Sequence, residues 1–110
     1  MKNIVNQKDY HLCHQAPLLI ITSNRPNYEN GIVDCALALE NIFLAAESMG
    51  LGSCYINLFH WFSKETLMRD YLAELGIPRD HVICGSAAVG HIGKPTEARP
   101  RKEGSVIKIM

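Results

Sequence analysis

The stretch VDCALALENIFLAAESMGLGSCYIN, residues 33–57, decides the fold of this 110-residue chain. From Gly31 to Met49 the sequence is rich in Ala and Leu and free of Pro, and Gly50 follows where a helix commonly ends in a left-handed residue. This pattern predicts a long helix. The next residues, GLGSCYIN at 50–57, predict a short strand or extended loop entered through flexible glycines.

The helix from Gly31 to Met49 has an unusually wide apolar surface. At about 100° per residue its polar side chains span only about 140° of the circumference. A surface helix needs an apolar face only a little wider than about 100°, so this helix requires a cover on two sides. A sheet of the same chain can supply one cover, and in so short a chain a second subunit is the expected source of the other. The sequence therefore predicts a homodimer through the Gly31–Met49 helix. Its polar residues are Asp34, Glu40, Asn41, Glu47 and Ser48.

The flanking segments predict alternating strands and helices. PLLIITS at 17–23 is a short apolar run that predicts a strand buried on both faces. Asn30 is the expected N-cap of the long helix. Ser63 is expected to cap a second helix over residues 64–75, which Gly76 and Pro78 end. VICGSAAVG at 82–90 predicts another buried strand, and VIKI at 106–109 a possible edge strand or an arm onto a partner. The expected order is β-α-β-α-β in one layered domain, residues 1–110.

Composition excludes several classes of protein. With 47% hydrophobic and 20% charged residues the chain is typical of globular proteins. Eleven basic residues balance eleven acidic ones, so no net charge favours binding to nucleic acid. The longest strand-like apolar run, residues 16–21, is far shorter than the roughly 20 residues of a membrane span. The polar N-terminus has no signal-peptide pattern, and the four cysteines form no C-x-x-C pair. These features predict a cytoplasmic protein with reduced thiols.

The segments ALEN, LAA and GLGSC, in this order before an aromatic residue and Ile-Asn, resemble the nitroreductase family. HQAPLLIITSNR upstream, and YLAELGIP, VICGSAAVGH and KPTEARPRK downstream, are similar to the blocks that flank this pattern in the family. The resemblance runs from about Tyr10 to about Val106 and concerns only the C-terminal part of the family's chain. It implies an α+β fold, a mixed sheet flanked by helices, truncated at the N-terminus, and an interlocked dimer.

The resemblance also implies a function. Family members bind FMN at the dimer interface and transfer hydride from NADH or NADPH to nitroaromatic, quinone or related acceptors. Reduction of a small-molecule acceptor through FMN is therefore the expected activity, and no side chain is expected to act as a nucleophile.

Five residues match flavin-contacting positions of the family. The segment Tyr55, Ile56 and Asn57 corresponds to the backbone beside the flavin ring, with the Asn57 N–H directed at flavin N5. Arg99 and Arg101 correspond to basic residues that hold the FMN phosphate, a role that suits the planar guanidinium. An ordinary core strand end is the alternative for the first segment. For the basic loop, the residues without the resemblance favour a solvated surface loop.

No metal site is expected. His11, Cys13 and His14 lie close in sequence, but nothing later in the chain completes a tetrahedral ligand set at a recognised spacing.

One departure from the family pattern leaves two alternatives open. The family begins with an Arg-Ser-x-Arg type segment that binds the flavin, and no such segment occurs in these 110 residues. One alternative is a partner chain that supplies this N-terminal flavin anchor, so that the oxidoreductase is active only with its partner. The other is a non-enzymatic truncated relative that acts as a dimerising or binding module.

Overall fold

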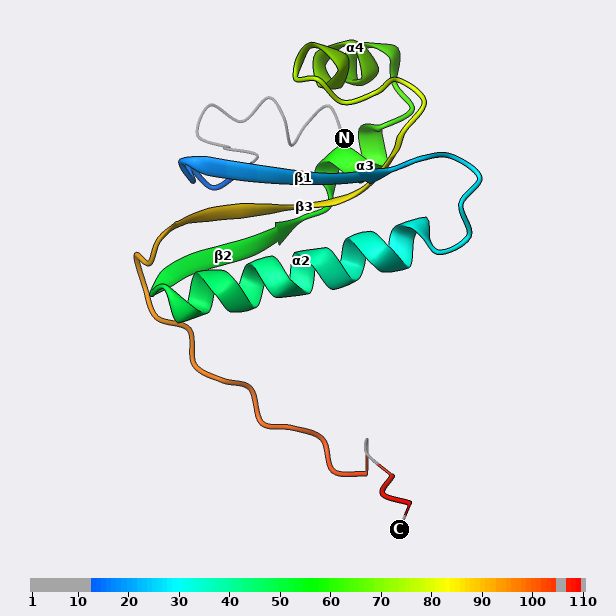
Figure 1. Cartoon of the computed structure of the whole chain (residues 1–110). Coiled ribbons are helices and arrows are strands. Elements are labelled where there is room, and N and C mark those ends of the chain that lie inside the picture. The colour runs from blue at the N-terminus through cyan, green and yellow to red at the C-terminus, as the bar shows by residue number, and fades with distance from the viewer. Residues whose placement is uncertain (1–12, 105–106, 110) are drawn as a thin grey trace.

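A computed structural model describes residues 13–104 and 107–109 of the chain. The described part contains a three-stranded sheet and three helices (Figure 1). In chain order these elements are β1 (Leu18–Asn24), α2 (Gly31–Ser48), β2 (Leu51–Ile56), α3 (Leu58–Phe62), α4 (Thr66–Glu74) and β3 (Val82–His91).

The sheet has the order β1-β3-β2, with β3 in the centre and both pairings antiparallel. Strand β3 is buried over most of its length because its run of small residues, from Gly85 to Ala88, lets both neighbours and both layers approach closely. The predicted α+β class is confirmed, and so are the long helix, the strand after it and the buried strand at 82–90.

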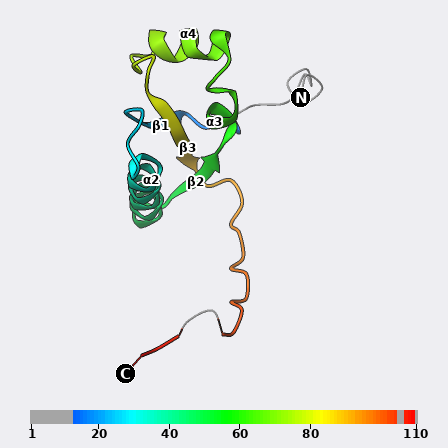
Figure 2. The same ribbon diagram turned by 90° about the vertical axis from the view of Figure 1, so that its right-hand side faces the viewer.

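Helices cover both faces of the sheet (Figure 2). Helix α2 packs Leu39 and Ala46 against Ala87 and Val89 on one face. Helices α3 and α4 form a second core cluster on the opposite face. That cluster consists of Ile56, Phe59, Leu72, Ile83 and Ala88.

A β-bulge interrupts the pairing of β1 with β3. Thr22 pairs with Gly85 while the next residue, Ser23, pairs with Ile83, so Cys84 is the extra residue on β3. The bulge places two successive residues toward α2: the Cys84 thiol lies 3.8 Å from the Gly31 carbonyl, and the Cα of Gly85 faces the Leu39 side chain.

Two local predictions are wrong, and one helix lies outside the predictions. Ser63 does not cap a helix over 64–75; its hydroxyl donates to the His60 carbonyl at the end of α3, and α4 begins at Thr66 after Glu65. Helix α3 itself was not predicted. Strand β1 is half-buried instead of buried on both faces, because it lies at the edge of the described sheet.

Single residues mark the start and the end of the predicted long helix, which is α2. Asn30 precedes α2 at the N-cap position but makes no side-chain capping hydrogen bond, and Gly50 has the expected positive φ of 71°. Of the predicted strand VIKI, residues 107–109 have no regular structure, and Val106 lies outside the described residues.

The chain beyond β3 has no regular structure in its described part and leads away from the sheet (Figure 1). Across the part of the chain that the structure describes, no helix combines the length and the apolar character needed to cross a bilayer.

Candidate functional site

The segment Tyr55–Asn57 lies where β2 ends and α3 begins. Asn57 is the N-cap of α3, with φ of −95° and ψ of −4°, and its carbonyl accepts a hydrogen bond of 3.2 Å from the Trp61 N–H. The backbone therefore changes from extended to helical at Asn57. At such a junction a backbone N–H can face outward without leaving a ladder hydrogen bond unmade.

Ile56 fixes the middle of this segment in the core. Its side chain is buried in the cluster with Phe59 and Ile83, and its carbonyl accepts a hydrogen bond of 2.7 Å from the Ser86 hydroxyl. Ser86 is fully buried and pairs with Ile56 in the β2–β3 register. Side chain and carbonyl of Ile56 are thus both held, which leaves this part of the segment little freedom.

Tyr55 lies on the α2 side of the sheet, across Gly85. A Cβ built on Gly85 would come within 2.8 Å of the Tyr55 ring, so the ring occupies the space that a larger residue would need. The Tyr55 hydroxyl donates to the side-chain oxygen of Asn57 at 2.9 Å. This bond ties Asn57 to the strand that precedes it.

Phe59 and His60 hold helix α3 against the core and β3. The Phe59 ring is buried, and Nδ1 of His60 lies 2.6 Å from the Ile83 carbonyl. A carbonyl oxygen only accepts, so Nδ1 carries the hydrogen in this contact. The two anchors hold the helix that starts at the candidate site.

The two predicted arginines are not brought to this segment. Arg99 and Arg101 are exposed on the chain that follows β3. The register pairs Leu51 with His91, so this chain leaves the sheet beside the first residue of β2, whereas Tyr55–Asn57 lies at its other end. The structure therefore keeps the two halves of the predicted flavin site apart within one chain.

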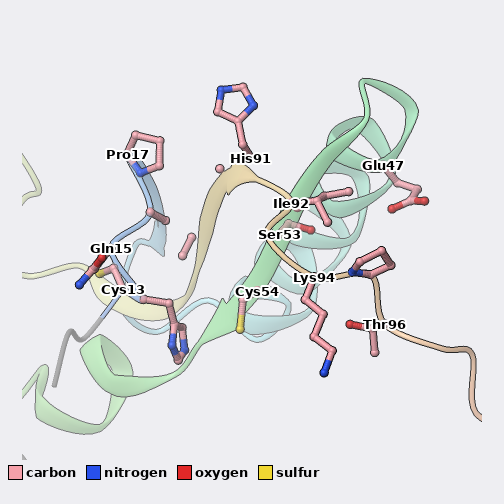
Figure 3. Close-up of a pocket in the computed structure, with 17 residues that line it drawn as sticks. Cys13, Gln15, Pro17, Glu47, Ser53, Cys54, His91, Ile92, Lys94 and Thr96 are labelled. Carbon is pink, nitrogen blue, oxygen red and sulfur yellow. The ribbon is translucent and has the colours of Figure 1, made fainter. Parts of the chain in front are cut away.

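A hollow of about 1120 Å³ lies at the end of the sheet where this chain leaves (Figure 3). Small residues, Gly52, Ala88 and Gly90, lie along it, with Cys54 beside them. Residues 13–17 lie on one side of it and the chain from Ile92 to Thr96 on the other. The hollow is broadly open to solvent, and its volume lies slightly above the range of about 300–1,000 Å³ that is typical of ligand pockets. Cys54 adjoins Tyr55, so the hollow reaches to the edge of the candidate segment.

Two thiols of the described chain have raised pKa values. Burial raises the pKa of Cys13. Burial, and after it the hydrogen bond and charge of Cys35, raise the pKa of Cys84 to about 12, against an opposing effect of the Asn24 backbone. Neither thiol is a ready nucleophile at neutral pH, because the thiolate is the reactive form.

The described residues contain no group of three or more His, Cys, Asp and Glu side chains that could hold a metal ion. Of the three neighbouring residues His11, Cys13 and His14, His11 lies outside the described residues.

Sequence reasoning missed two residues around the segment, Ser86 and Gly85, and it did not predict the hydrogen bond of His60 to the Ile83 carbonyl. A single polar residue within the apolar run VICGSAAVG was a usable signal for Ser86. The contacts of Gly85 and His60 join positions 23 or more residues apart, and periodicity carries no information on such pairs.

A model of the nitroreductase family matches residues 4–91. The chain is 35% identical over 82 residues to an FMN reductase (NADPH) of Bacillus subtilis, and 34% identical over 77 residues to an NADPH-flavin oxidoreductase of Vibrio harveyi. These matches cover 74% and 70% of the chain. A crystal structure of a nitroreductase with bound FMN from Bacteroides fragilis superposes with a TM-score of 0.91 at 33% identity, over 99% of the chain.

The chain is shorter than these relatives. It covers 30% of each of the two curated oxidoreductases and 59% of the Bacteroides fragilis chain. The family model, over residues 4–91, spans β2, the candidate segment and β3.

Proposed function

The chain belongs to the nitroreductase family, and from this membership we propose that it is an FMN-dependent oxidoreductase that passes hydride from NADH or NADPH to a small-molecule acceptor. Nitroaromatic and quinone-like compounds are the proposed acceptors, and the cytoplasm is the proposed location. The names of the relatives support flavin chemistry with NADPH as donor, and the similar Bacteroides fragilis structure holds FMN.

The observation that carries the proposal is the fixed backbone at Tyr55–Asn57. The described residues fit a flavin ring there because the segment offers a peptide N–H at a strand end, beside a half-exposed aromatic side chain. FMN, when bound, supplies the hydride-accepting and hydride-donating ring, and the protein binds and orients it. Asn57 is the proposed N–H donor to the ring, with Tyr55 and Ile56 as its supports.

Arg99 and Arg101 are the proposed phosphate anchors. Each can form two parallel charge-assisted hydrogen bonds with phosphate oxygens. Because the chain carrying them leaves the sheet at the end remote from Asn57, we propose that they reach the site of a second copy. The apolar side chains that α2 exposes, among them Val33, Leu37 and Leu44, support a homodimer in which this can happen.

The test is the visible absorption of the purified protein after addition of excess FMN and desalting. Retained flavin bands, near one FMN per subunit or per dimer, are expected. A colourless protein after this treatment would overturn the proposal of a self-sufficient flavoprotein.

The second candidate function is a dimerising or binding module without flavin. The separation of the two arginines from Tyr55–Asn57 within one chain favours it. A colourless protein that is nevertheless a folded, tight homodimer would support this candidate over the first.

A further inference from the structure

Ser86 is a polar side chain placed where the packing requires none. It is fully buried in β3, between Gly85 and the small apolar residues Ala87 and Ala88. A buried hydroxyl needs a hydrogen-bond partner, whereas an alanine at the same place would not. The hydroxyl finds its partner in the Ile56 carbonyl, 2.7 Å away.

This hydrogen bond fixes the direction of a second group. The Ile56 carbonyl and the Asn57 N–H belong to the same peptide unit, which is planar and trans. In such a unit the C–O and N–H bonds point in opposite directions. With the oxygen held toward Ser86 on β3, the Asn57 N–H points away from β3. Strand β2 is at the edge of the described sheet, so that direction leads outward from the sheet.

We infer that Ser86 is a positioning residue, which holds the Ile56–Asn57 peptide so that the Asn57 N–H is presented to flavin N5. This inference rests on the proposed function. N5 of oxidised flavin is a hydrogen-bond acceptor, and after reduction it carries a hydrogen and no longer accepts this bond. A fixed N–H therefore favours the oxidised cofactor and lowers its reduction potential.

The chain contains a matched control for this bond. Thr22 donates its hydroxyl to the Gly85 carbonyl at 2.9 Å, which is another side-chain bond to a main-chain carbonyl in the same sheet. The peptide that it holds lies in β3 and not in the Tyr55–Asn57 segment. Thr22→Val removes a bond of the same kind and leaves the Ser86 bond in place.

The first arm of the test needs no flavin. Chemical shifts of the Ile56 carbonyl carbon and the Asn57 amide are measured by NMR in the wild type, Ser86→Ala and Thr22→Val. We expect both signals to move in Ser86→Ala and to stay near their wild-type positions in Thr22→Val. Unchanged Ile56 and Asn57 signals in a folded Ser86→Ala protein would overturn the inference.

The second arm measures the reduction potential of bound FMN and its dissociation constant. Loss of one hydrogen bond that only the oxidised flavin accepts should weaken the binding of oxidised FMN, relative to that of reduced FMN, by about fivefold. For a two-electron couple this is a positive shift of about 20 mV in Ser86→Ala, with little shift in Thr22→Val. Equal potentials in Ser86→Ala and the wild type would contradict the role of Ser86.

The two arms separate the inference from the function on which it rests. If the wild type retains no FMN, the proposed function fails, and the NMR arm still decides whether Ser86 sets the peptide. If FMN is retained but Ser86→Ala changes neither the NMR signals nor the reduction potential, the proposed function is supported and the positioning role of Ser86 is refuted.

Discussion

Gly85 has no side chain because the Tyr55 ring lies where its Cβ would be. A Cβ at this position would lie 2.8 Å and 2.9 Å from two atoms of Tyr55 and 3.0 Å from Leu39 Cδ1. Gly85→Ala should therefore displace the Tyr55 side chain and lower the free energy of unfolding by about 1–3 kcal/mol, a typical cost of overpacking. Urea denaturation measures this loss.

Gly93→Ala is the control for the loss of a glycine as such, since nothing lies within 4 Å of a Cβ built there. Equal stabilities of Gly85→Ala and Gly93→Ala would show that the Tyr55 ring does not occupy this space.

The buried Cys84 thiol should lower the free energy of unfolding at alkaline pH. Its pKa is raised from 9.0 to about 12, first by burial and then by Cys35. Between these values the unfolded chain has lost the proton and the folded chain keeps it. The free energy of unfolding therefore falls as pH rises above about 9, by up to about 1.4 kcal/mol per pH unit.

Denaturation at several pH values in the wild type and Cys84→Ala measures this effect. The decline in stability should be shallower in Cys84→Ala, and Cys54→Ala, at an exposed thiol, controls for removal of a cysteine. Parallel pH profiles for the wild type and Cys84→Ala would refute the assignment to Cys84.

At the scale of the element, α2 presents two apolar faces. Cys35 and Leu39 are buried against the sheet, while Val33, Leu37 and Leu44 are more than half exposed. At about 100° per residue Leu37 lies nearly opposite Leu39 on the helix. Exposed apolar side chains on the outward face of a helix are typical of an interface.

Leu37→Glu should break the proposed dimer, because a charge would be buried without a partner in the apolar contact. Sedimentation of the wild type is expected to give a dimer and that of Leu37→Glu a monomer with an unchanged circular dichroism spectrum. Leu67→Glu, at an exposed leucine on α4, is the control and should remain a dimer. A dimeric Leu37→Glu protein would place the interface elsewhere.

Sequence predicted the elements whose signal is local and missed those that depend on distant contacts. Helix α2 follows from 18 residues without a breaker, and Gly50 marks its end. Helix α3 has five residues, too few for a stable isolated helix, and it is held by the buried Phe59 ring and the bond from His60 to Ile83. Ser63, the cap that local rules favoured, donates its hydroxyl to the His60 carbonyl at the end of α3, and α4 begins at Thr66.

At the scale of the whole molecule, the candidate site has two parts. The structure holds the flavin-ring segment in place, whereas only the resemblance assigns the phosphate-binding arginines to the site. Tyr55, Ile56 and Asn57 are packed and hydrogen-bonded. Arg99 and Arg101 lie on a chain that leads away from them, and no pattern in the sequence could indicate that separation. Their role as phosphate anchors stays a prediction.

Replacing both Arg99 and Arg101 by Gln should weaken FMN binding by about tenfold or more, the size expected for lost charge-assisted hydrogen bonds. Riboflavin, which has no phosphate, should bind equally well before and after the change. Lys108→Gln, on the same part of the chain, is the control. Fluorescence titration with both flavins measures these affinities, and an equal loss for riboflavin and FMN would exclude a phosphate contact.

We propose that this chain carries out flavin-dependent hydride transfer. This proposal is tested most directly by mixing FMN-loaded, desalted protein with NADH or NADPH without air and following the visible flavin absorption. We expect one or both nucleotides to bleach the flavin bands and a quinone or nitroaromatic acceptor to restore them. A protein that retains no flavin, or whose bound flavin neither nucleotide reduces, would contradict it.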